Sequence, residues 1–263
     1  MAYIISSGEL ESGIILTSNS MTVLDGGTAT DTTVNSGGRL FVSNGGTADT
    51  TTVNAVGSMN VKGGTANHTT INSGGKCFVS GSGTADDVEV NCGGVLSVGK
   101  DGAATNIMEN GGNVDVADGA NVTFQANTFV ATLNDMTTAT VHSGTTAANT
   151  TVNSGLLTVY SGGRASDTIV NSGGTFSISG GGTAENTRIA SSGRMSISSG
   201  GVADVVNITS NGTVNVLKGG VASNVYVRVN GGIRIASGGK LTGKVIDLEG
   251  VIYASSGRSW TSI

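Results

Sequence analysis

The sequence predicts an all-β protein: a right-handed parallel β-helix, or solenoid, of about 14 coils with about 19 residues in each coil. Three observations lead to this fold class. The 263 residues include 44 Gly and no Pro, a glycine-containing phrase returns at a fixed period, and apolar residues alternate with polar ones between the phrases. Glycine permits sharp turns with positive φ, and the absence of Pro leaves every backbone N–H free to donate to a ladder between strands.

The turns come from two phrases that recur in step about every 19 residues. The first phrase is Gly26-Gly27-Thr28-Ala29, which returns in similar form at residues 45–48, 63–66, 82–85, 181–184, 200–203 and 219–222. The second is Val34-Asn35-Ser36-Gly37-Gly38, which returns at residues 71–75, 90–94 and 170–174. Because both phrases recur over nearly the whole chain, we expect a stack of similar coils.

The strands are predicted from alternating apolar residues that fall in the same place in each repeat. One inward column contains Met21, Leu40, Met59, Cys77, Leu96, Val114, Leu157, Phe176, Met195, Val214, Ile233 and Ile252. A second, two residues later, contains Val23, Val42, Val61, Val79, Val98, Val116, Val159, Ile178, Ile197, Val216, Ile235 and Ala254. A third, on the other strand of the repeat, contains Val34, Val53, Ile71, Val90, Val152, Val170, Ile189, Ile208, Val227 and Ile246. Each repeat alone is too small to bury a face, so the coils must bury one another.

We expect one repeat domain over residues 1–263, with an irregular coil at 121–143. This segment has no Gly and is longer than the repeat requires, and it contains Phe124, Phe129 and Asp135. It predicts either longer strands with a protruding loop or a candidate contact loop for a ligand, since loops on repeat scaffolds carry function.

An asparagine column follows the third apolar column: Asn35, Asn54, Asn72, Asn91, Asn153 and Asn171, with Glu109 and Asp247 in step. Stacked Asn side chains can hydrogen-bond along the stack, so we interpret this column as structural. A second polar column, Asp31, Asp87, Asn149, Asp167, Asn186 and Asn224, is interpreted as solvated turn residues.

The composition of the chain and the positions of its His and Cys residues argue against nucleic-acid binding, membrane insertion, catalysis and metal binding. The net charge of −5 disfavours a nucleic-acid partner, and the chain contains neither a long apolar segment for membrane insertion nor a signal peptide at Met1. His68 and His142 fall in different coils and at different points of the repeat, so we expect no catalytic, cofactor or metal site. Cys77 falls on an inward column and Cys92 in a turn, so no disulfide is expected.

The order and spacing of the phrases resemble the repeats of AIDA-type autotransporter passengers. The resemblance covers Met1 to about Gly257 and implies a β-helix displayed at a bacterial cell surface or secreted, with roles in adherence, self-association or biofilm. It also implies O-linked heptose on Ser and Thr, in which this chain is rich. Implied partners are host or bacterial surface glycans and proteins, or copies of the chain itself.

We therefore expect a non-enzymatic surface adhesin or self-association module that acts through polyvalent lateral or end-to-end contacts. End-to-end association is suggested by the acidic side chains of the first half and the basic ones of the second. Two alternatives remain: a carbohydrate-binding or carbohydrate-degrading β-helix with its site at residues 121–143, and a passive stalk or spacer.

Overall fold

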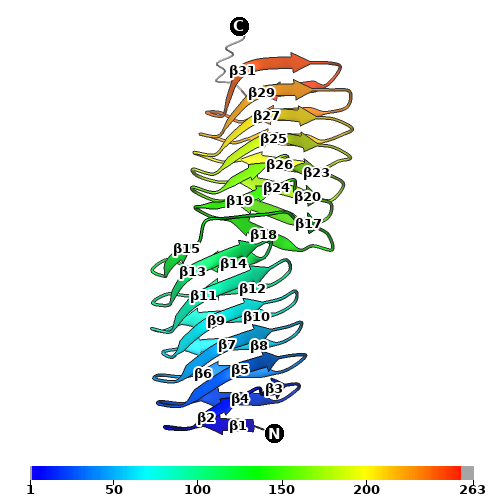
Figure 1. Cartoon of the computed structure of the whole chain (residues 1–263). Coiled ribbons are helices and arrows are strands. Elements are labelled where there is room, and N and C mark those ends of the chain that lie inside the picture. The colour runs from blue at the N-terminus through cyan, green and yellow to red at the C-terminus, as the bar shows by residue number, and fades with distance from the viewer. Residues whose placement is uncertain (1, 256–263) are drawn as a thin grey trace. The chain divides into compact units, whose positions relative to one another are not determined.

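The computed structural model describes residues 2–255, which form parallel β-strands and no helix. The chain divides into two compact units, Met1–Gln125 and Ala126–Ile263. Each unit contains one sheet of short strands and one sheet of longer strands that are bent or broken in the middle, and the chain passes between the two sheets in every coil (Figure 1). The fold is a parallel β-solenoid of about 13 turns. The expected fold class and the repeat of about 19 residues are confirmed.

The first unit has a seven-stranded and an eight-stranded sheet. The seven-stranded sheet contains β1 (Ala2–Ile5), β4 (Ser20–Val23), β6 (Arg39–Val42), β8 (Ser58–Lys62), β10 (Lys76–Ser80), β12 (Val95–Val98) and β14 (Asn113–Val116). The eight-stranded sheet contains β2 (Leu10–Ser12), β3 (Ile15–Leu16), β5 (Thr28–Val34), β7 (Thr47–Val53), β9 (Thr65–Ile71), β11 (Thr84–Asn91), β13 (Ala103–Asn110) and β15 (Asn121–Phe124).

The second unit has a ten-stranded and a seven-stranded sheet. The ten-stranded sheet contains β16 (Asn127–Phe129), β17 (Thr132–Leu133), β19 (Thr145–Ala148), β20 (Thr151–Val152), β22 (Arg164–Ser166), β23 (Ile169–Val170), β25 (Thr183–Ile189), β27 (Val202–Ile208), β29 (Val221–Val227) and β31 (Lys240–Asp247). The seven-stranded sheet contains β18 (Thr138–Val141), β21 (Leu156–Val159), β24 (Thr175–Ile178), β26 (Arg194–Ile197), β28 (Thr213–Val216), β30 (Gly232–Ile235) and β32 (Val251–Ala254).

The register of the short strands confirms the first two apolar columns. Each strand pairs in parallel with the next coil so that like positions face each other, as in Met21 opposite Leu40 and Val23 opposite Val42. Nearly all members of these columns are fully buried. The exceptions lie at the ends of the sheets. Val116, with 39% of its surface exposed, lies on the edge strand β14. Ile252 and Ala254 on the edge strand β32, and Ile235 on the neighbouring β30, are half-buried.

The long strands have three inward positions, of which the sequence predicted only the last. In β5 these are Ala29, Thr32 and Val34, all buried. Two consecutive residues, Thr30 and Asp31, separate the first two, because Asp31 has a positive φ of 52° and bends the strand. An outward pair in mid-strand breaks strict alternation, so the Ala and Thr positions were missed.

Two assignments to the columns were wrong. Glu109 pairs with Val90 and is fully buried in the third inward column, while Asn110 pairs with Asn91 and takes the place predicted for Glu109. In β31 an irregularity beside Gly243 shifts the register, so that Asp247 rather than Ile246 lies opposite Val227. In β31 the strand register itself is displaced by one residue, whereas Glu109 keeps the regular offset from Val90 and only the turn that follows it is one residue shorter. A displacement of one residue moves each side chain to the opposite face.

The glycine pairs at the turns have distinct roles. Gly37 has a φ of +74°, which glycine adopts without steric cost. A Cβ on the next residue, Gly38, would lie 2.4 Å from the carbonyl oxygen of Leu16 in the preceding coil. The second glycine therefore allows successive turns to approach at the strand spacing. No helix long and apolar enough to cross a membrane occurs in residues 2–255.

Candidate functional site

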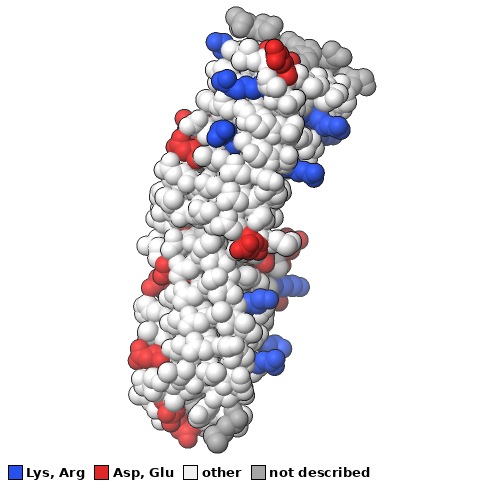
Figure 2. All heavy atoms as spheres, turned by 90° about the vertical axis from the view of Figure 1, so that its right-hand side faces the viewer, with Lys and Arg blue, Asp and Glu red and all other residues white. Residues whose placement is uncertain are grey.

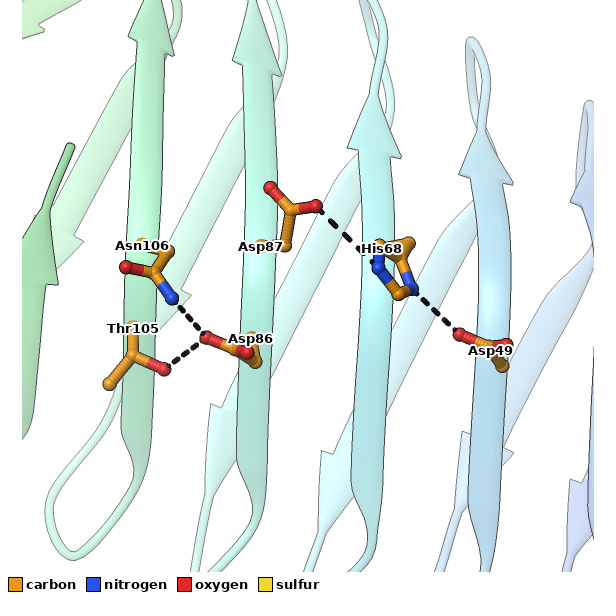
Figure 3. Close-up of polar contacts among 6 residues, drawn as sticks. All are labelled: Asp49, His68, Asp86, Asp87, Thr105 and Asn106. Carbon is orange, nitrogen blue, oxygen red and sulfur yellow. Dashed lines mark hydrogen bonds and ion pairs between the residues drawn. The ribbon is translucent and has the colours of Figure 1, made fainter.

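A polar stripe runs across the long strands of the first unit where each strand bends. It consists of Asp49, His68, Asp86, Asp87, Thr105 and Asn106, and we call it the acidic stripe (Figure 3). His68, Asp87 and Asn106 have positive φ values of 50–56°, and Asp49, Asp86 and Thr105 lie at or beside the same bend in their own strands. Asp, Asn and His tolerate this backbone conformation better than most residues, so the bend itself selects polar side chains for this line.

His68 lies between carboxylates of the two neighbouring coils. Its Nδ1 is 2.9 Å from Oδ1 of Asp49, and its Nε2 is 3.8 Å from Oδ2 of Asp87. The hydrogen bond with Asp49, together with the negative charges of Asp49, Asp87 and Asp86, raises the pKa of His68 above its ordinary value. The imidazole therefore gains a proton more readily in this stripe than in free solution.

Asp86 accepts hydrogen bonds from the next coil. Oγ1 of Thr105 and Nδ2 of Asn106 both donate to its Oδ1, the latter over 2.8 Å. These two bonds lower the pKa of Asp86. The second unit repeats the arrangement, with Ser223 and Asn224 donating to Oδ1 of Asp204 and lowering its pKa. The bend thus builds the same carboxylate-centred cluster in different coils.

The Asn column forms hydrogen-bonded ladders. In the first unit the Nδ2 of each residue donates to the Oδ1 of the residue one coil earlier, at 2.8–3.0 Å, along Asn35, Asn54, Asn72, Asn91 and Asn110. In the second unit the ladder runs through Asn134, Asn153 and Asn171. Asn110 was missed because the turn after it is one residue shorter, and Asn134 because it lies in the irregular segment 121–143, which has no Gly.

The residues of the candidate contact loop are not brought together as an exposed group. The boundary between the units falls inside the segment, between Gln125 and Ala126. Phe124 is half-buried and packs against the core of the first unit. Phe129 is only 3% exposed and faces inward on β16, so its ring is not available to a ligand. Asp135 is exposed in a turn, where its backbone N–H donates to Oγ of Ser154.

The two cysteines lie as the columns predicted. Cys77 is buried, which raises the pKa of its thiol to about 12, and Cys92 is half-buried in a turn. Both are free thiols. Among residues 2–255 no three His, Cys, Asp or Glu side chains are grouped so that they could hold a metal ion.

Most of the surface is uncharged and hydroxyl- or amide-bearing. On the face shown in Figure 2 the charged side chains stand apart, separated by neutral residues. Neighbouring strands of a sheet are about 4.8 Å apart, so each polar group recurs at that spacing along a unit. Such an array offers many weak hydrogen-bonding contacts of one kind, which suits polyvalent binding.

Comparison with known proteins agrees with this architecture. Residues 2–57 and 152–193 match the AIDA family, described as "Adhesin of bacterial autotransporter system, probable stalk". The chain is also similar to the crystal structure of a fragment of TibA hyper-glycosylated by TibC. The sequence identity is 32% and the TM-score 0.55, over 97% of this chain and 92% of that one. Among curated proteins no match was found. From its repeats, its solenoid fold and these similarities, the chain belongs to the AIDA family of bacterial autotransporter adhesins.

Proposed function

We propose that this chain is a non-enzymatic adhesion or self-association module of a bacterial surface protein. Membership of the family implies the outer surface of the cell. The observation that carries the proposal is that outward polar side chains recur beside the bend of successive long strands and form similar clusters, around Asp86 in the first unit and Asp204 in the second. Many equivalent contacts along a unit can give strong attachment even where each contact is weak.

The partners in this proposal are surface glycans or proteins of host or bacterial cells, or further copies of the chain. Display of the whole chain on a bacterium that neither clumps nor adheres should make its cells settle or attach to a surface. Cells that display only the carrier serve as the control. Equal settling of the two populations would overturn the proposal.

The absence of enzyme activity is part of the same proposal and has its own test. Incubation with mixed polysaccharides should release neither reducing ends nor unsaturated products. Turnover that the substitution Asp135→Asn abolishes would instead support a carbohydrate-degrading site in residues 121–143.

We further propose that outward Ser and Thr side chains carry O-linked sugars in the producing cell. The support is the similar TibA fragment, which is hyper-glycosylated, and the density of hydroxyls on this surface. Mass spectrometry of the chain from its natural host should show Ser- and Thr-linked sugar masses. An unmodified mass from a host that has a matching glycosyltransferase would contradict this.

A passive stalk is a second candidate, favoured by the family description, which includes the words "probable stalk". A stalk would hold an adhesive domain away from the cell and bind nothing itself. Replacement of the chain by an unrelated solenoid of similar length distinguishes the two. A stalk retains adhesion after the exchange, whereas an adhesive module loses it.

A further inference from the structure

The second unit has a polar groove along its ten-stranded sheet, beside the bend of the long strands. Its volume is about 600 Å³, and residues from five successive coils line it. Of its lining residues, Asp167 and Asn186 lie at the bend, and Arg188, Asn207, Thr209 and Arg228 lie further along their strands or just after them. In the sheet Ile169, Arg188 and Asn207 occupy equivalent positions on consecutive strands, so the groove runs along the stack of coils.

Two arginines in this groove have no carboxylate partner. Arg188 and Arg228 are exposed, and neither forms an ion pair with any residue of 2–255. Arg164, on the same sheet, is paired with Glu185. The groove contains one carboxylate, Asp167, and Nδ2 of Asn186 already donates to it. The groove therefore presents two arginines without an ion pair, and the one carboxylate that lines it is already hydrogen-bonded.

The spacing of the two arginines fits an extended ligand. Arg188 lies on β25, and Arg228 directly follows β29, two strands further along the sheet. At the usual strand separation this places their backbones about 10 Å apart along the stack. Guanidinium groups bind carboxylates and sulfates in a bidentate manner. Asn207 and Thr209, between the two arginines, supply amide and hydroxyl groups that suit sugar hydroxyls.

We propose that this groove binds an acidic polysaccharide, with Arg188 and Arg228 each holding an acidic group of the chain. The glycan lies along the stack, and its hydroxyls contact Asn186, Asn207 and Thr209. The inference names a partner class for the proposed adhesive function and rests on that function for its biological meaning. It identifies a site in the second unit, distinct from residues 121–143.

Binding of a galacturonic acid hexamer to the whole chain tests the proposal, measured by calorimetry at low and high salt. We expect the hexamer to bind at low salt, the single sugar acid and the neutral hexamer of glucose to bind at least tenfold more weakly, and affinity to fall as salt rises. Arg188→Gln or Arg228→Gln should each reduce affinity about tenfold, because a hydrogen-bonded charged partner is lost. Arg194→Gln is the matched control, since Arg194 is an exposed arginine on β26 of the other sheet.

Three results would overturn the proposal: no binding of the hexamer at low salt, an equal loss of affinity in Arg194→Gln, or equally tight binding of a glutamate hexapeptide. The last result would indicate an acidic peptide or protein as the ligand. If only the groove proposal is wrong, cells that display the chain would still settle or attach, so this outcome is distinguishable from failure of the adhesive function. Circular dichroism and melting of each variant should match the parent protein, since all three side chains are exposed.

Discussion

The residues at the bend of the long strands share a positive φ and differ in how well they tolerate it. Asp31, Asp87, Asn106, Asn149, Asp167, Asn186 and Asn224 suit the left-handed region, whereas Thr50 and Val205 are β-branched and do not. The polar column that the sequence showed is thus a consequence of backbone geometry. Most of its members lie within a long strand, and Asn149 and Asp167 lie in the short break between two strands of the same sheet, whereas the sequence assigned the column to turns.

Val56 is strained in the same way and gives a direct test. It has a φ of 62° and is 71% exposed, in the turn position that Gly37 and Gly74 occupy in neighbouring coils. Val56→Gly should raise the free energy of unfolding by about 1 kcal/mol, because it relieves the strain and removes little buried surface. Thermal unfolding measures the change.

The control for this change is Val229→Gly. Val229 is also exposed in a turn of the same kind, and it lacks a positive φ. Glycine there should lower stability through the added freedom of the unfolded chain. Stabilisation by both substitutions would show that glycine acts by some route other than relief of strain at Val56.

His68 predicts a dependence of stability on pH. Folding raises its pKa above the ordinary value of 6.5, chiefly through Asp49. The protonated form therefore contributes stability that is fully present below pH 6.5 and is lost as the pH rises through the folded-state pKa. The melting temperature should fall between about pH 5.5 and pH 8.5 more in the parent than in His68→Asn. An identical decrease in both proteins would contradict a role for His68, and NMR titration of the imidazole gives its pKa independently.

In the Asn ladder, the stability that each side chain contributes depends on its position along the stack of coils. Asn72 donates to Asn54 and accepts from Asn91, whereas Asn35 at the start of the ladder only accepts from Asn54. At about 1 kcal/mol for each hydrogen bond, Asn72→Ala should cost about 2 kcal/mol and Asn35→Ala about half as much. Equal costs in denaturant unfolding would mean that the ladder does not stabilise the stack.

The inward threonines of the long strands are a weak point of the core. Thr51 is buried, and its hydroxyl has no hydrogen-bond partner within residues 2–255; Thr32 and Thr69 are alike. Val88 and Ile107 occupy the same position in later coils. Thr51→Val should therefore raise stability by about 1 kcal/mol, because it removes an unpaired polar group and keeps the shape. Thr52→Val, on the outward side, should change stability little, and an equal gain there would contradict the assignment.

The sequence predicted the short strands and their two columns correctly because alternation there is uninterrupted, as in Met21 and Val23. It predicted only one of three inward positions in the long strands, because the bend at Asp31 places two outward residues together. Glu109 was misplaced because the turn after Asn110 is one residue shorter than the turn after Asn91, so that counting back from the glycine pair leads to Glu109. The glycan groove had no sequence signal, since Arg188 and Arg228 lie 40 positions apart and meet only through the stacking of coils.

Across the whole molecule, charge is distributed unevenly along the sequence. Residues 1–150 carry 13 acidic and 4 basic side chains, and residues 151–263 carry 5 and 9. The acidic stripe belongs to the first unit and the two unpaired arginines of the groove to the second. Repeats with similar inward columns can therefore differ in the sign of their surface charge, because outward positions are not constrained by packing.

This asymmetry predicts association between copies through their oppositely charged halves, either side by side or end to end. Attraction between exposed charges extends about 10 Å at 0.1 M salt and about 3 Å at 1 M, so the association should weaken as salt is added. The mass measured by light scattering should rise with protein concentration at low salt and return toward that of the monomer at 1 M salt. Lys218→Glu combined with Lys240→Glu should lower the association at low salt, whereas the neutral change Ser97→Thr should not. A chain that stays monomeric at high concentration and low salt would exclude attraction between copies, and adhesion would then depend on contacts with other surface molecules.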